Sequence, residues 1–148
     1  MSSVGEAIAE GARRESDVWS ASLRAEPDWE PVFSPLAPET YALGLETVYE
    51  AYLVHYGRAR LFDAPDQNEA VLLGDYLYAH GLVRIAAAGG VSAVETMAAL
   101  VSRCAALRAE HGDGDAEAWI DAVRSLGGEP SALAVEHAVA RHSARVAP

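Results

Sequence analysis

The stretch from Glu69 to Ile85, EAVLLGDYLYAHGLVRI, constrains the fold of this chain more than any other segment. It is apolar on almost every side of a helix, a pattern typical of a helix that the rest of the fold covers. Asp75, His80 and Arg84 interrupt the apolar run. Because burying a charge without a partner costs several kcal/mol, we expect Asp75 to have one. The segment therefore predicts a buried central helix that carries a partnered acid.

The rest of the sequence also favours helices. Alanine, leucine, glutamate and arginine are abundant, and no stretch alternates apolar and polar residues for long, as a strand would. We predict a single all-α domain over residues 1–148, a bundle of five to six helices around the buried central helix. An outer helix over residues 1–24, a proline-rich connector over 25–38 and a helical core over 39–146 make up this domain.

The connector is dense in prolines, namely Pro27, Pro31, Pro35 and Pro38. Proline at this density blocks helix and favours extended backbone. The connector also contains large apolar residues, namely Trp29, Val32, Phe33 and Leu36. A free linker would not be this apolar, so we expect the connector to lie across a groove of this chain or of a neighbour.

Capping residues and glycines divide the helical core. In chain order they are Asp63 or Asp66 ahead of the central helix, Gly89-Gly90 after it, Ser92 ahead of a fourth helix, Asp115 ahead of a short fifth helix and Ser131 ahead of the last. The helix before the central one is predicted from the spacing of its apolar face, which ends at His55.

Charge and composition exclude several functions. The formal net charge is −11 and the chain has no lysine, so nucleic acid is not an expected partner and neither Schiff-base chemistry nor a P-loop is available. The single cysteine, Cys104, is expected to fill the core. The N-terminus has no apolar signal segment and no apolar run reaches the roughly 20 residues of a membrane span, so we expect a soluble, cytoplasmic chain.

Two segments resemble a known enzyme family. Residues 70–77, AVLLGDYL, resemble the A-V/I-L-x-G-D-Y/F-L segment of the trans-isoprenyl (polyprenyl) diphosphate synthases. Residues 45–55, LETVYEAYLVH, are similar to the helix that precedes this segment in the family, approximately L-E-L-I-H-x-x-x-L-I-H. The resemblance spans about residues 41–107 and implies part of the all-α isoprenoid synthase fold.

The family's metal-binding aspartates have no counterpart here. In the family, D-D-x-x-D follows the first of these helices and holds magnesium on the allylic diphosphate. Tyr56 and Gly57 occupy the two leading positions of that motif, and no aspartate pair in this register occurs in the chain. Ionising an allylic diphosphate requires magnesium ions held by clustered carboxylates. The resemblance therefore implies a divergent, truncated relative with no catalytic residues or cofactor of its own, in which magnesium would come only with a catalytic partner.

A related arrangement exists in heptaprenyl diphosphate synthase, where a small all-helical subunit keeps a G-D-Y segment, lacks the aspartate motifs and pairs with a catalytic subunit. Residues 66–76 are similar to the segment of that subunit. We expect a non-catalytic or accessory relative that acts through oligomer assembly, as a homodimer or beside a catalytic prenyl synthase subunit. Two alternatives remain open: a binding module for an isoprenoid or other apolar ligand, and a small prenyltransferase-type enzyme acting on allylic diphosphates.

Five residues are candidates for ligand binding, namely His55, Arg58, Arg60, Asp75 and His80. We expect His55 and Asp75 to form a buried pair, with Arg84 or Tyr52 as the next candidate partners of the acid. Metal binding by His55, Asp75 and His80 is disfavoured, because three ligands would have to converge. Arg58 and Arg60 could meet a diphosphate, although a surface position is the preferred interpretation.

Two further acidic groups are better explained without a ligand. Asp63, Asp66 and Glu69 form the nearest local cluster for magnesium, but helix capping accounts for them. The polar segment 111–117 contains two glycines and is interpreted as a solvated turn.

Overall fold

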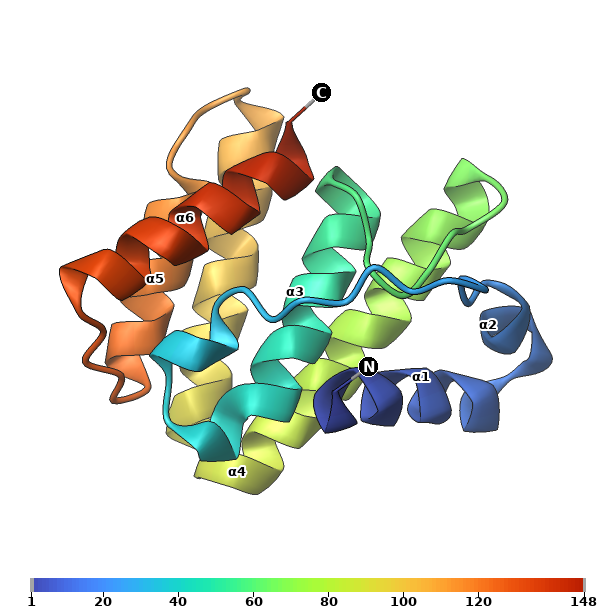
Figure 1. Ribbon diagram of the computed structural model, residues 1–148, viewed down its shortest axis with the longest axis horizontal. Helices are drawn as coiled ribbons and strands as arrows, with labels where there is room; N and C mark the ends of the chain where they lie inside the picture. The colour runs from blue at the N-terminus through green and yellow to red at the C-terminus, as the bar shows by residue number, and fades with distance from the viewer. Residues whose placement is uncertain (1, 148) are drawn as a thin grey trace.

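The computed structural model describes residues 2–147 and folds them into helices, with no β-strand among them (Figure 1). The elements are α1 (Ser3–Glu15), α2 (Asp17–Ala21), the 3-10 turns η1 (Ser34–Leu36) and η2 (Glu39–Tyr41), α3 (Ala42–Tyr56), α4 (Gln67–Ala109), α5 (Asp115–Ser125) and α6 (Ala132–Val146). The prediction of an all-α bundle is confirmed.

Helix α3 is the buried centre of the bundle (Figure 1). All residues from 44 to 53 are buried, because α1, α4, α6 and the connector each contact this helix. The prediction that residues 69–85 form the covered central helix is wrong, since Leu72 and Val83 are 59% and 65% exposed. That segment belongs to α4, which turns one face to α3 and the opposite face to solvent. Burial within this chain therefore does not explain why the residues on its outer face are apolar.

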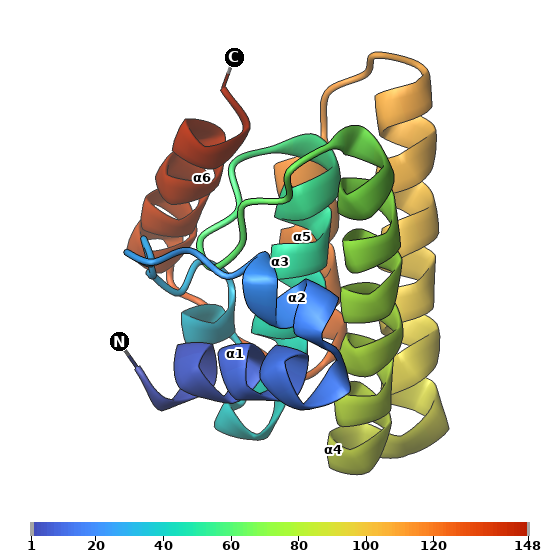
Figure 2. The same ribbon diagram turned by 90° about the vertical axis from the view of Figure 1, so that its right-hand side faces the viewer.

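Helix α4 is a hairpin of two arms (Figure 2). Gly90 has φ 70° and ψ −158°, a conformation that favours glycine, and the chain reverses there. The first arm comprises residues 67–89 and the second arm residues 91–109, and the two run in opposite directions. The predicted break at Gly89-Gly90 is confirmed. The second arm is the fourth helix that the sequence predicted, but Ser92 lies inside it, so the prediction that Ser92 caps this helix is wrong.

Glycines allow α3 and the first arm to cross at close range. A Cβ on Gly81 would lie 2.6 Å from Cγ2 of Val48, and a Cβ on Gly74 would collide with the ring of His55. Any larger residue at these positions would push the two helices apart. The backbones and side chains of α3 and α4 therefore fill the crossing.

The proline-rich connector lies on α3, in a groove of this chain. This is one of the two predicted positions, the other being a groove of a neighbouring chain. Val32, Phe33 and Leu36 are buried. The backbone N–H groups of Val32 and Ser34 donate to Glu46 at 3.2 and 3.0 Å. Polar and apolar contacts therefore hold this segment on α3, and its own helical hydrogen bonds are confined to the turn η1.

A buried ion network fixes the loop that follows α3. Arg60, Glu46 and Glu50 are all fully buried. Nη1 of Arg60 lies 2.5 Å from Glu46, and its Nε lies 2.9 Å from Glu50. Glu50 also accepts from the backbone N–H groups of Arg60 and Leu61. One arginine thus neutralises part of the charge of two carboxylates that lie one turn apart on α3.

The N-terminal segment forms two helices where one outer helix over residues 1–24 was expected. Ser16 is extended, with φ −165°, and precedes the first residue of α2. Its side chain caps α2 by accepting a hydrogen bond from the N–H of Trp19. Ile8 and Ala12 are buried, so α1 packs within this chain. The break reflects the strong capping preference of serine, which outweighed the helical propensity of the flanking residues.

Candidate functional site

The five residues that the sequence singles out as ligand contacts do not form one site. They are His55, Arg58, Arg60, Asp75 and His80, and they lie on α3, on the loop after it and on the first arm of α4. Only His55 and Asp75 come together, and each of the other three contacts a different part of the chain.

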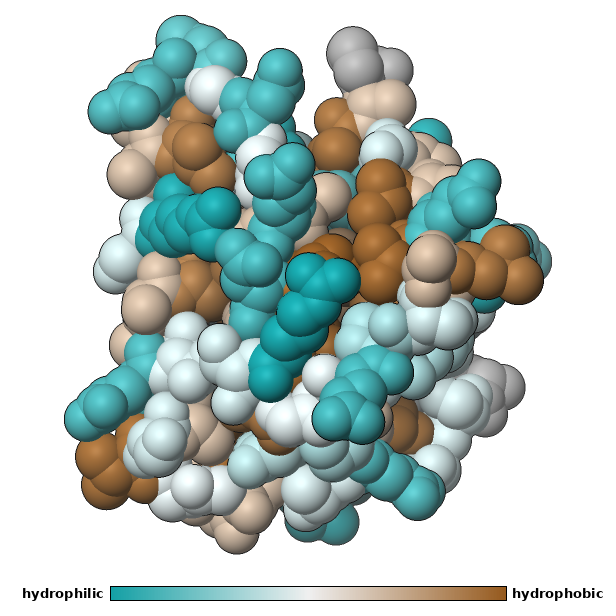
Figure 3. Space-filling model, turned by 90° about the vertical axis from the view of Figure 1, so that its left-hand side faces the viewer, coloured by the Kyte–Doolittle hydropathy of each residue, from teal (hydrophilic) through white to brown (hydrophobic). Residues whose placement is uncertain are grey.

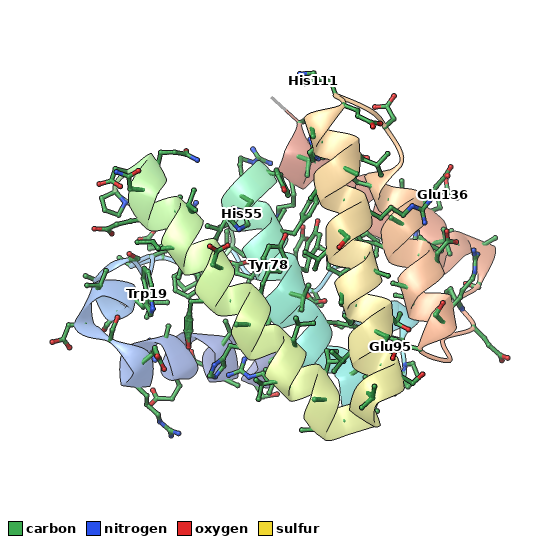
Figure 4. The ribbon with its side chains drawn as sticks, turned by 180° about the vertical axis from the view of Figure 1, so that it is seen from behind. Trp19, His55, Tyr78, Glu95, His111 and Glu136 are labelled. Carbon is green, nitrogen blue, oxygen red and sulfur yellow. The ribbon has the colours of Figure 1, made fainter. Side chains whose placement is uncertain are left out.

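His55 and Asp75 form a pair, with 3.6 Å between Nε2 and Oδ1. The expected burial of the acid is wrong, because the Asp75 side chain is 68% exposed. Burial lowers the pKa of His55, and the charge of Asp75 partly opposes this effect. Tyr78 stacks on the His55 ring, with ring centroids 5.3 Å apart, and both residues lie between the two arms of α4 (Figure 4). The pair is a half-exposed contact at the edge of the α3–α4 crossing.

The two arginines have separate structural contacts. Arg60 is fully buried in the ion network with Glu46 and Glu50, so the preferred prediction of a surface position is wrong for this residue, and its guanidinium is not open to a diphosphate. Arg58 is exposed and donates through Nη2 to the carbonyl oxygen of Ala144 on α6. The two neighbouring arginines therefore do not point into a common cavity.

His80 belongs to the contact between α1 and the first arm. Its ring packs edge-on against Tyr76, with centroids 5.2 Å apart, and it lies close to Gly11 of α1. Within residues 2–147, no three His, Cys, Asp or Glu side chains are grouped as metal ligands would be. Asp66 caps α4 by accepting from the N–H of Glu69 at 2.9 Å, as the sequence predicted.

A polar cluster that the sequence did not suggest joins α3, the second arm and α5. The Tyr52 hydroxyl donates to Oδ2 of Asp115, which also accepts from Nε of Arg108 at 2.8 Å. Nη2 of Arg108 donates to the Tyr52 oxygen at 2.6 Å. Burial, followed by the hydrogen bond to Asp115, raises the pKa of Tyr52, so the phenol stays protonated. Oδ1 of Asp115 is buried without a hydrogen-bond partner.

The sequence assigned Asp115 to a helix cap, and this assignment is wrong. Gly114, with φ 113°, is the residue that precedes α5, so the Asp115 side chain is free to reach Tyr52. The spacing of 63 residues between Tyr52 and Asp115 gives no local pattern from which their contact could be predicted.

His142 of α6 lies next to this cluster. Its Nδ1 shares a hydrogen bond of 2.8 Å with the Tyr49 hydroxyl. Burial lowers the pKa of His142 to about 4, so the ring is neutral near pH 7. A recess of about 300 Å³ is lined by Arg108, Asp115 and His142, among other residues. The arginine, the carboxylate and the neutral imidazole tie four helices together at this end of the bundle.

A second recess lies between α5 and α6. Its volume is about 570 Å³, and its lining includes the charged residues Glu117, Asp121 and Arg124 beside the apolar Ile120, Val135 and Val139. Figure 3 shows this side of the molecule, where hydrophilic side chains are interspersed with apolar ones. The recess has no polar group that the structure leaves buried and unpaired.

The most unusual surface is the outer face of the first arm of α4. It carries a row of residues that we call the outer strip, namely Leu72, Asp75, Ala79, Val83, Ala86 and Gly90, all of which are exposed. Val71 and Val91 beside the strip are 41% and 75% exposed. Figure 4 views the molecule from this side, with the two arms in front of α3. Asp75 is the one charge in the strip.

By length and composition, α4 is apolar enough to cross a membrane. The reversal at Gly90 folds it into two arms that contact α3 and α5. No family model, curated protein or solved structure matches the chain.

Proposed function

We propose that the protein acts by assembling with another protein through the outer strip of α4. The observation that carries this proposal is the lack of charge on an exposed surface. Charged residues make up 22% of the chain, yet Asp75 is the only charged residue among the exposed residues between positions 70 and 94. A contiguous apolar surface of this kind is typical of a protein interface.

The exposed apolar side chains are large enough to contribute to binding. Val71, Leu72, Val83 and Val91 are between 41% and 75% exposed. Covering them would contribute roughly 5 kcal/mol, at about 2 kcal/mol for a fully exposed side chain of this size. Association entropy opposes binding by a similar or larger amount, so this strip needs additional contacts around it.

One form of this assembly follows from the resemblance to the polyprenyl diphosphate synthases. Residues 45–55 and 70–77, which carry the resemblance, lie on α3 and on the first arm, and they cross where Gly74 meets His55. In this form the chain is an accessory subunit beside a catalytic synthase. Asp75 does not support this form of assembly, because its side chain was expected to be buried and is exposed.

Sedimentation velocity over a range of protein concentrations tests the proposal, with and without a full-length prenyl synthase. Leu72→Glu should abolish any complex, because it places a charge in the strip. Leu133→Glu is the matched control, since Leu133 is 60% exposed on α6, almost the same as Leu72 at 59%. If the wild type stays monomeric in both conditions, or if both variants weaken assembly equally, the proposal is wrong.

The two alternative functions give different results with the same samples. An isoprenoid-binding module would retain a lipid that native mass spectrometry detects. A small enzyme would turn over an allylic diphosphate with magnesium when no other chain is present, and Asp75→Asn would reduce that rate.

A further inference from the structure

We propose that the outer strip is occupied by a second copy of this chain, packed antiparallel about a two-fold axis near residue 81. The inference rests on the proposed function and names the partner. Its evidence is the order of large, small and charged residues along the strip.

The strip residues recur every three or four positions, so they form one continuous face of the first arm. In an antiparallel pair centred at residue 81, Leu72 of one copy lies opposite Gly90 of the other. Ala79 likewise lies opposite Val83. Each larger side chain therefore meets a glycine or an alanine, which is the condition for close interlocking of two helices.

The charge on the strip selects the antiparallel direction. Asp75 lies level with Ala87 in this arrangement, next to Ala86 of the strip, and the two Asp75 residues are about 18 Å apart along the helices at 1.5 Å per residue. This distance exceeds the screening length of about 8 Å at physiological ionic strength. A parallel pair in register would place the two carboxylates directly opposite each other. Each Asp75 also keeps its own His55 at 3.6 Å as a polar partner.

The size of the strip sets the expected affinity. Residues 72–90 extend about 27 Å, and a helix about 10 Å wide gives a footprint of roughly 300 Å² per copy. A stable interface buries about 800 Å² per partner. Figure 4 shows the second arm beside the first, and this arm also carries small exposed residues, namely Ala98, Ala105 and Ala106. We expect a dimer with a dissociation constant on the order of micromolar.

A second copy fits this strip better than a lipid surface. The chain has a net charge of −11 and no lysine, so anionic headgroups repel it. The same charge makes two copies repel each other, and added salt screens this repulsion. Dimerisation should therefore become stronger between low and moderate salt concentration, which is the opposite of an interface held by ion pairs.

Disulfide trapping in the full chain tests the register. Cys104 is 1% exposed and stays in place. Chains carrying Ala79→Cys are mixed with chains of different mass carrying Val83→Cys and oxidised mildly. The mixture should give a cross-linked heterodimer, because the two Cα atoms fall within the 4.4–6.8 Å that a disulfide requires. Leu72→Cys alone should not cross-link, because its two copies would be about 27 Å apart.

The outcomes separate the register from assembly itself. A wild-type dimer whose Leu72→Cys variant cross-links with itself overturns the antiparallel register and leaves assembly through the strip intact. A wild type that is monomeric at about 200 μM but forms a complex with a prenyl synthase overturns the second copy as the partner and leaves the proposed function intact. A monomer that binds phosphatidylcholine vesicles, or that binds nothing, overturns both.

Discussion

Replacing Arg60 with methionine tests whether the buried ion network holds the loops on α3. The change removes the bonds from the guanidinium to Glu46 at 2.5 Å and to Glu50 at 2.9 Å. It also removes the contact with the Trp29 ring, whose centroid lies 4.2 Å from the guanidinium carbon. The two carboxylates would remain buried, one turn apart, with only backbone N–H donors.

The expected cost is large compared with the stability of a domain. Removing one partner of a buried ion pair costs about 3–5 kcal/mol, and the lost cation–π contact adds about 1 kcal/mol. A domain of this size is stable by about 5–15 kcal/mol. We therefore expect the variant to retain its fold with about 5 kcal/mol less stability, or to be partly unfolded at 25 °C.

Urea denaturation followed by circular dichroism measures this loss. Arg58→Met is the matched control, because Arg58 is exposed two residues away and makes one side-chain hydrogen bond, to the carbonyl of Ala144. Its cost should stay below about 1 kcal/mol. The reasoning is refuted if the two variants differ by less than about 1 kcal/mol. A triple variant that also carries Glu46→Gln and Glu50→Gln should recover part of the loss, because no buried charge then remains.

Two other changes test the packing around α3. Because burial lowers the pKa of His142 from 6.5 to about 4, the folded chain favours the neutral ring and loses stability as pH falls through this range. Between pH 7 and pH 4 the unfolding free energy of the wild type should fall by about 3 kcal/mol more than that of His142→Gln, and equal losses would contradict this assignment. Gly81→Ala should destabilise by about 1–3 kcal/mol in the same urea assay, although alanine is the better helix former, because its Cβ would lie 2.6 Å from Val48. A gain in stability would show that the crossing has room for a methyl group.

Local sequence patterns predicted the elements of the fold well where the determining interactions are short in range. Asp66 and Ser131 cap their helices through N–H groups three residues ahead, and Gly90 reverses the chain. Val32, Phe33 and Leu36 of the connector are buried. These outcomes depend on capping geometry, on glycine's freedom to adopt positive φ and on the need to bury aromatic side chains, all of which are encoded within a few residues.

Only the tertiary structure decided which helix is central and which charged groups are buried. Residues 45–55 and 69–85 are both apolar, but α3 is enclosed because segments distant in sequence converge on it, whereas α4 keeps an outer face. Arg60 can be buried because it forms ion pairs with Glu46 and Glu50 of α3. Asp75 stays exposed because its partner His55 lies at the edge of the α3–α4 crossing. Hydrophobicity indicates that a face must be covered, but it does not specify whether this chain or another one covers it.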